Sequence, residues 1–155
     1  MKFNFLIIPA IIVAVAYFGA RYTTAGLGSW YLKLKKPSWT PNGKTIGEIW
    51  TTLYLLTGFA VMWYWNVPKF SGLHYAVGVL LLINAGLNLY WSKLFFVDHD
   101  LRLAYKEMIV MNVLAIAAAI LMMFSSIMAG VLLLPYIVWV GVATKLTKEI
   151  ISLNK

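Results

Sequence analysis

Five long apolar runs are the feature of this sequence that most restricts its fold. Each has 18 or more residues, and they lie at about 3–20, 45–65, 73–94, 101–124 and 128–151. A helix of that length crosses the roughly 30 Å of hydrocarbon in a bilayer. Only helices and closed barrels pair all their backbone groups in lipid, and the alternation of barrel strands is absent. The sequence therefore predicts an all-α membrane protein, a single domain over 1–155 built as a bundle of five transmembrane helices.

The composition agrees with a membrane protein. Apolar residues make up 62% of the 155, and the mean hydropathy is +0.81. That leaves too few polar residues to cover a soluble domain of this size. The chain has no cysteine, which excludes disulfides, thiol catalysis and thiolate metal sites. The net charge of +8 lies at the ends of apolar runs, so we assign it to membrane topology and expect no nucleic-acid partner.

The distribution of basic residues predicts the orientation. With five crossings, Lys2 and Lys69 lie on the N-terminal side, and the other eleven of the 13 lysines and arginines lie opposite. The positive-inside rule then places the N-terminus outside the bacterial cell membrane and the C-terminus in the cytoplasm. A secretory signal peptide is the alternative reading of the first run, with Lys2 before it and small residues at Ala14 and Ala16. The run is longer than a usual signal core and contains Pro9, so we favour a transmembrane helix.

A polar stretch from Trp30 to Trp50 separates the first two runs. It holds three of the seven tryptophans, two of the five prolines and four lysines. Irregular backbone in a membrane protein lies where water reaches it, so this loop is a candidate ligand entrance. Its pattern W-Y-x-x-L-x-K-P-x-W-x-P, over residues 30–41, resembles the first-loop signature of the TspO/MBR family. These are tryptophan-rich sensory proteins, whose mitochondrial members are called translocator protein or peripheral benzodiazepine receptor.

Two later motifs support the same resemblance. N-x-x-W-x-x-x-F-F at 88–96 is similar to the family's third-helix motif, and P-Y-x-x-W-x-x-x-A at 135–143 to its fifth-helix motif. The three motifs occur in the family's order with helix-sized gaps, as in a bacterial-type member. The chain departs from the family pattern at four positions. It has Asn42 in place of a proline, Lys44 and Ile46 in place of aromatic residues, and Thr147 in place of an asparagine.

Polar and aromatic side chains recur at helical spacing. Asn84, Asn88, Trp91 and Phe95 follow i, i+4, i+7 and i+11, which places them on one face of a helix. Facing lipid is costly for a carboxamide, so this face should point into the bundle. Alternatively, the two asparagines only bond neighbouring helices. Two further predicted stripes are Trp50, Tyr54, Thr57, Gly58 and Val61, and Pro135, Trp139, Ala143, Leu146 and Ile150. An interfacial aromatic belt is expected at Trp63, Tyr64 and Trp65.

These stripes and the loop predict one ligand pocket. Its expected ligand-binding residues are Tyr31, Trp39, Trp50, Tyr54, Asn84, Asn88, Trp91, Trp139 and Ala143. An aromatic wall with a few polar groups suits a large, flat, mostly apolar ligand. The resemblance implies a tetrapyrrole, protoporphyrin IX above all, bound without a covalent link. Its propionates would favour lysines near the mouth, where the candidates are Lys33, Lys35, Lys36 and Lys44. The alternative is that these lysines only set topology and contact lipid phosphates.

No conventional catalytic constellation is visible. We find no Ser/His/Asp set, phosphate-binding glycine loop or paired carboxylates. His74 and His99 lack a second ligand at metal spacing, so no metal site is expected. The resemblance implies that some bacterial members degrade protoporphyrin in light, with Trp50 and Trp139 as the redox partners. Glu107 is open between an ion pair with a neighbouring basic residue, Arg102 or Lys106, and a functional role.

Three functional interpretations remain from the sequence. The first is a tetrapyrrole-binding sensor or translocator, the second a light-dependent porphyrin oxidase, and the third a small-solute or drug transporter without porphyrin preference. The tyrosine of the pattern often linked to cholesterol is absent from 140–155. Small residues that permit close helix approach predict a homodimer; they are Gly78, Ala85, Gly86 and the run 115–119.

Overall fold

A computed structural model describes residues 3–28, 30–67 and 71–155. The helices of this part are α1 (Asn4–Leu27), α2 (Trp30–Lys33), α3 (Gly43–Asn66), α4 (Ser71–Phe96), α5 (Leu101–Met123) and α6 (Ile127–Leu153). All except the short α2 are long and apolar enough to cross a membrane, which gives five candidate spans. The predicted fold class is therefore confirmed.

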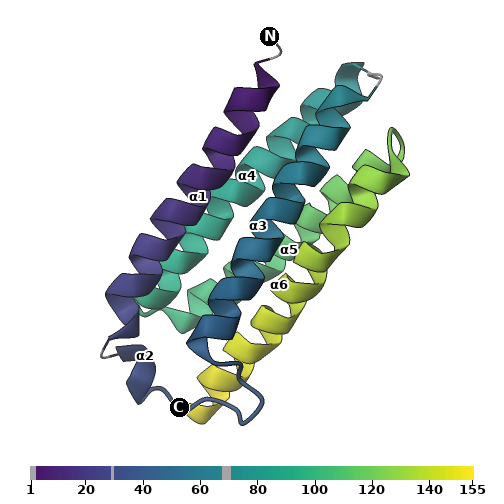
Figure 1. Cartoon of the computed structure of the whole chain (residues 1–155). Coiled ribbons are helices and arrows are strands. Elements are labelled where there is room, and N and C mark those ends of the chain that lie inside the picture. Colours follow the sequence, from purple (N-terminus) through teal and green to yellow (C-terminus); the bar gives the residue numbers. More distant parts are fainter. Residues whose placement is uncertain (1–2, 29, 68–70) are drawn as a thin grey trace.

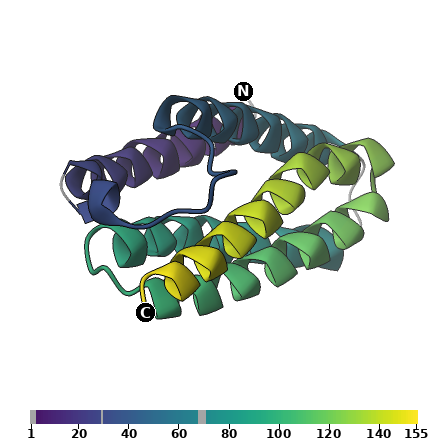
Figure 2. The ribbon, with the colours of Figure 1, turned by 90° about the horizontal axis from the view of Figure 1, so that it is seen from below.

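The five long helices form a closed ring (Figures 1 and 2). Each packs against two neighbours, in the order α1, α4, α5, α6, α3 and back to α1. The two termini lie at opposite ends of the bundle (Figure 1), as an odd number of crossings requires. We call the end that carries α2 and the C-terminus the loop end, and the other the N-terminal end.

Helix α1 is longer than predicted, because it passes Arg21 and ends at Leu27. The hydroxyls of Thr23 and Thr24 donate to carbonyls one turn earlier, so they add no unpaired polar group. The added turns pack tightly on α4. A Cβ on Gly26 would lie 2.3 Å from the carbonyl oxygen of Phe96, so only glycine allows this approach.

The stretch between α1 and α3 contains more helix than the sequence indicated. Residues 30–33 form α2, and α3 begins at Gly43, two residues before the predicted start. Asn42 caps α3, because its Oδ1 accepts a hydrogen bond of 2.9 Å from the backbone N–H of Thr45. The irregular part of the loop is therefore limited to residues 34–42.

The predicted aromatic belt is wrong for Tyr64. Its ring is fully buried and stacks on His74 of α4, with centroids 4.3 Å apart and planes 15° apart. His74, placed at a segment end by the sequence, is buried in the same stack. Trp63 is half-exposed, as a belt residue would be. Residues 68–70, which include the basic residue Lys69, lie outside the described residues.

Small residues serve packing inside the chain. Ala115, Ala118 and Ala119 of α5 are buried, so most of the predicted dimerisation run faces the interior. Gly78 does too, since a Cβ there would lie 2.9 Å from the ring of Trp65. The close approach that both groups permit is thus used within the bundle, and the homodimer stays a prediction.

Candidate ligand-binding site

Aromatic rings from three helices meet around Trp50 of α3. Its ring centroid lies 5.6 Å from that of Tyr54, 6.1 Å from Trp91 of α4 and 6.4 Å from Tyr136 of α6. These distances are in the range of favourable ring–ring contacts. We call these four residues the Trp50 cluster. It lies toward the loop end, because Trp50 is two turns from the start of α3.

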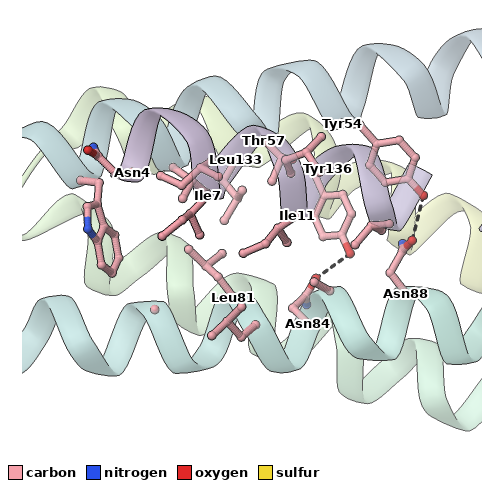
Figure 3. A pocket seen from close by; sticks show the side chains of 18 of the residues that line it. Asn4, Ile7, Ile11, Tyr54, Thr57, Leu81, Asn84, Asn88, Leu133 and Tyr136 are labelled. Carbon is pink, nitrogen blue, oxygen red and sulfur yellow. Dashed lines mark hydrogen bonds between the residues drawn. The ribbon is translucent and has the colours of Figure 1, made fainter. Parts of the chain in front are cut away.

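Two tyrosine–asparagine hydrogen bonds cross the bundle beside this cluster (Figure 3). Tyr54 Oη donates to Asn88 Oδ1 at 2.8 Å, and Tyr136 Oη donates to Asn84 Oδ1 at 2.7 Å. Asn84 Nδ2 also donates to the carbonyl oxygen of Met111 at 2.7 Å, so this amide bonds neighbouring helices as the structural alternative proposed. Within the described residues, the acceptor of Asn88 Nδ2 is the sulfur of Met111 at 4.0 Å, a weak acceptor, so this amide retains donor capacity.

A cavity of about 360 Å³ extends from these hydrogen bonds toward the N-terminal end (Figure 3). Its volume is within the range of small-molecule sites. Helices α1, α3 and α4 supply most of the wall, and α5 and α6 contribute Ala115, Leu133 and Tyr136. Tyr54, Asn84 and Asn88 line its inner end, so the two tyrosine–asparagine pairs separate it from Trp50.

The 34–42 loop folds across the loop end of the ring and is fastened to α6 (Figure 2). Lys35 N–H donates to Asn154 Oδ1 at 3.0 Å, and Asn154 Nδ2 donates back to the Lys35 carbonyl at 2.8 Å. Further along, Trp39 Nε1 donates to Glu149 Oε2 at 2.8 Å, and Lys145 Nζ lies 5.5 Å from the Trp39 ring centroid. The loop therefore covers the aromatic end of the bundle.

Lys36 places a positive charge near the aromatic end of the bundle. Its Nζ donates to the carbonyl oxygens of Tyr31 and Leu34, at 2.8 and 3.0 Å, and lies 4.6 Å from the Tyr31 ring centroid. The Tyr31 ring packs against Phe95, with centroids 6.2 Å apart. Burial raises the pKa of the Tyr31 phenol, so the phenol is neutral at physiological pH. Lys44 pairs instead with Glu48, 3.9 Å away on the surface.

The structure brings some of the nine predicted site residues together at the cavity and places the others elsewhere. Tyr54, Asn84 and Asn88 line the cavity, and Trp50 and Trp91 stand behind it. The others lie apart from the cavity wall: Tyr31 under the loop, Trp39 turned outward to Glu149, and Trp139 and Ala143 packed in the loop-end core. Within the described residues, Trp139 makes no ring contact with Trp50, and its Nε1 is buried without a hydrogen-bond partner.

The sequence did not single out two parts of the site. Tyr136 is an inner-end residue from α6, although its place in the fifth-helix motif was a usable signal. The isoleucines of α1, such as Ile7 and Ile11, form one cavity wall. This helix is apolar on all sides, so no periodic stripe marks the inward face.

Glu107 does not form the ion pair considered above. It is 7% exposed, and within the described part of the chain neither carboxylate oxygen has a hydrogen-bond partner. Arg102 and Lys106 are absent from the ion pairs of this part. Helix geometry keeps Lys106 away from Glu107. Glu107 lies on the buried face of α5, and consecutive residues point about 100° apart around a helix.

Five apolar helices arranged as a ring, under an aromatic loop, define an integral membrane protein with an internal cavity. A sequence model of the TspO/MBR family matches residues 6–153, and the chain belongs to that family. It is 36% identical over 152 residues to the tryptophan-rich protein TspO of Bacillus cereus, covering 94% of this chain and 96% of that protein. It is 30% identical over 143 residues to the translocator protein of Bos taurus, covering 90% and 82%.

Proposed function

We propose that this TspO/MBR family protein binds a tetrapyrrole such as protoporphyrin IX inside the helix bundle and acts as a sensor or translocator. The observation that supports this most is the Trp50 cluster: rings from three helices meet beneath a loop that carries lysine. Aromatic rings offer broad flat contact surface to a macrocycle, each pair contributing about 1 kcal/mol beyond area burial.

Polar groups near the cluster suit the rest of such a ligand. Asn88 Nδ2 retains donor capacity toward an acceptor on the macrocycle. On the loop side, Lys36 Nζ lies 4.6 Å from the ring centroid of Tyr31, and Lys33 and Lys35 precede it in sequence. Propionate groups need such counter-charges, so the ligand would direct them toward the loop.

Titration of the purified protein with protoporphyrin IX, in the dark and under illumination, tests the proposal. Saturable binding with stable absorption bands supports a binding or sensing role. Binding followed by loss of the bands only in light would favour the porphyrin oxidase, in which Trp50 and Trp139 are the candidate redox partners. Absence of saturable binding would contradict the proposal and leave the small-solute transporter.

A further inference from the structure

The cavity on the N-terminal side of the tyrosine–asparagine pairs has a chemistry different from that of the loop end. Lysine, arginine, histidine, aspartate and glutamate are all missing from its wall in the described part of the chain. A dianionic ligand would have no counter-charge there, and an unpaired charge buried in an apolar wall is very costly. The cavity therefore selects against a tetrapyrrole with two propionates and favours a neutral occupant.

The cavity is elongated. Its α1 wall runs from Phe3 to Val15, twelve residues of helix or about 18 Å at the α-helical rise. Its α3 and α4 walls have similar lengths, from Tyr54 to Trp65 and from Gly78 to Asn88. A volume of about 360 Å³ spread over that length suits one extended chain better than a broad ring system.

A hydroxyl without a partner lies in this apolar wall. Six other helical threonines donate to the carbonyl four residues earlier: Thr23, Thr24, Thr51, Thr52, Thr144 and Thr147. Thr57 does not, and its buried Oγ1 has no hydrogen-bond partner in the described residues. A buried hydroxyl left unpaired destabilises the protein, so a ligand hydroxyl that pairs with it is favoured.

The seam between α1 and α4 gives the cavity access to the bilayer. These helices approach closely toward the loop end, where a Cβ on Gly26 would lie 2.3 Å from the carbonyl oxygen of Phe96. The first turns of α1 stand apart from the other helices in Figure 1. Ile7 of α1 and Leu82 of α4 both line the cavity, yet they are 54% and 57% exposed. Side chains rather than backbone close this part of the wall, so a membrane-dissolved molecule can pass between them.

From these observations we propose that the cavity is a second, separate site for a neutral, single-chain lipid alcohol. The molecule enters from the bilayer between α1 and α4, and its hydroxyl bonds Thr57. The hydrocarbon chain lies along the isoleucines of α1. The site shares the tyrosine–asparagine pairs with the tetrapyrrole site, but the rest of its wall is separate. One ligand can therefore bind while the other is absent.

Photo-crosslinking tests this site with hexadecanol that carries a diazirine on its chain, using protein in nanodiscs. Labelling should map to α1 and α4 residues of the cavity wall and exceed that by the matching hexadecanoate. Ile11→Trp fills the cavity and should abolish the labelling, while Ile83→Trp, on the exposed side of α4, should leave it unchanged. If Ile11→Trp fails to fold, Leu82→Trp at the seam replaces it.

Thr57→Val tests the hydroxyl contact, since it keeps the shape of the side chain. It should lower the preference for the hexadecanol probe over the same diazirine probe without its hydroxyl by about two- to tenfold. This ratio corresponds to one net hydrogen bond. Equal labelling by hexadecanoate, or undiminished labelling of Ile11→Trp and Leu82→Trp, would overturn the proposal. Protoporphyrin binding should be unchanged in Ile11→Trp, and its loss there would refute two separate sites.

Discussion

Tyr54 and Asn88, 34 residues apart, join α3 to α4 through a hydrogen bond of 2.8 Å between the phenol and the amide oxygen. The bond lies where the cavity ends and the Trp50 cluster begins. Together with the second tyrosine–asparagine hydrogen bond, between Tyr136 and Asn84, it divides the interior into an apolar half and an aromatic half. The fold thereby offers two chemically different environments.

Removing the Tyr54 hydroxyl should destabilise the bundle. Tyr54→Phe leaves Asn88 Oδ1 buried without this donor, a loss of about 1–3 kcal/mol for an unsatisfied polar group. Thermal unfolding in detergent should show a lower midpoint. The matched control is Tyr75→Phe, whose side chain is 73% exposed on α4. Equal midpoints for the two variants would show that the Tyr54 bond does not stabilise the fold.

The clasp between the loop and α6 should limit access to the aromatic end. Asn154→Ala removes both hydrogen bonds to the Lys35 backbone. We expect faster amide hydrogen exchange across residues 34–42, with α5 unchanged, because only the loop loses a tether. Ser152→Ala, an exposed position two residues before Asn154, is the control. Unchanged exchange in Asn154→Ala would mean that other contacts hold the loop.

Homodimer formation remains a prediction, and the structure moves its expected interface. On α4, Gly86 has open space around its Cβ position. It shares an exposed apolar face with Val79, Ile83 and Tyr90. We expect Gly86→Leu to weaken a dimer measured by light scattering, because the small residue permits close approach. Gly78→Leu should instead disturb Trp65 within the chain. A dimer that survives Gly86→Leu unchanged would exclude this face.

The orientation in the membrane also remains a prediction. A reporter active only in the cytoplasm should be active when fused after Lys155, because eleven of the 13 basic residues lie on that side. The same reporter fused after Ser126, at the turn between α5 and α6, should be inactive. Activity after Ser126 and none after Lys155 would show that the protein has the opposite orientation in the membrane.

Sequence periodicity located the helices and one inward face well. Asn84, Asn88, Trp91 and Phe95 are all buried, because a helix with amides in lipid must turn them inward. Of the expected α6 stripe, Ala143 and Ile150 are buried, whereas Trp139 and Leu146 are only partly buried and Pro135 is exposed. The other buried residues of that face are Leu133, Tyr136, Val140 and Thr147. Apolar side chains suit both lipid and core, so hydropathy alone could not fix that rotation.

The loop and the cavity depend on contacts that local sequence does not encode. Trp39 turns outward because Glu149, 110 residues away, accepts its N–H. The cavity wall includes α1, whose inward face carries no polar marker. Both features arise from the way distant helices meet, and single-sequence patterns do not report such contacts.

Protoporphyrin titration of the wild type, Trp50→Phe and Trp139→Phe tests the central claim most directly. Phenylalanine keeps most of the apolar area, so each substitution should weaken binding by less than about tenfold, with the larger loss at Trp50 because of its three ring contacts. Trp63→Phe, on the half-exposed side of α3, is the control and should bind like the wild type. If illumination bleaches the wild-type complex, Trp50→Phe should prevent that loss. Wild-type protein without saturable binding, or identical affinities for Trp50→Phe and Trp63→Phe, would contradict a tetrapyrrole site at the Trp50 cluster.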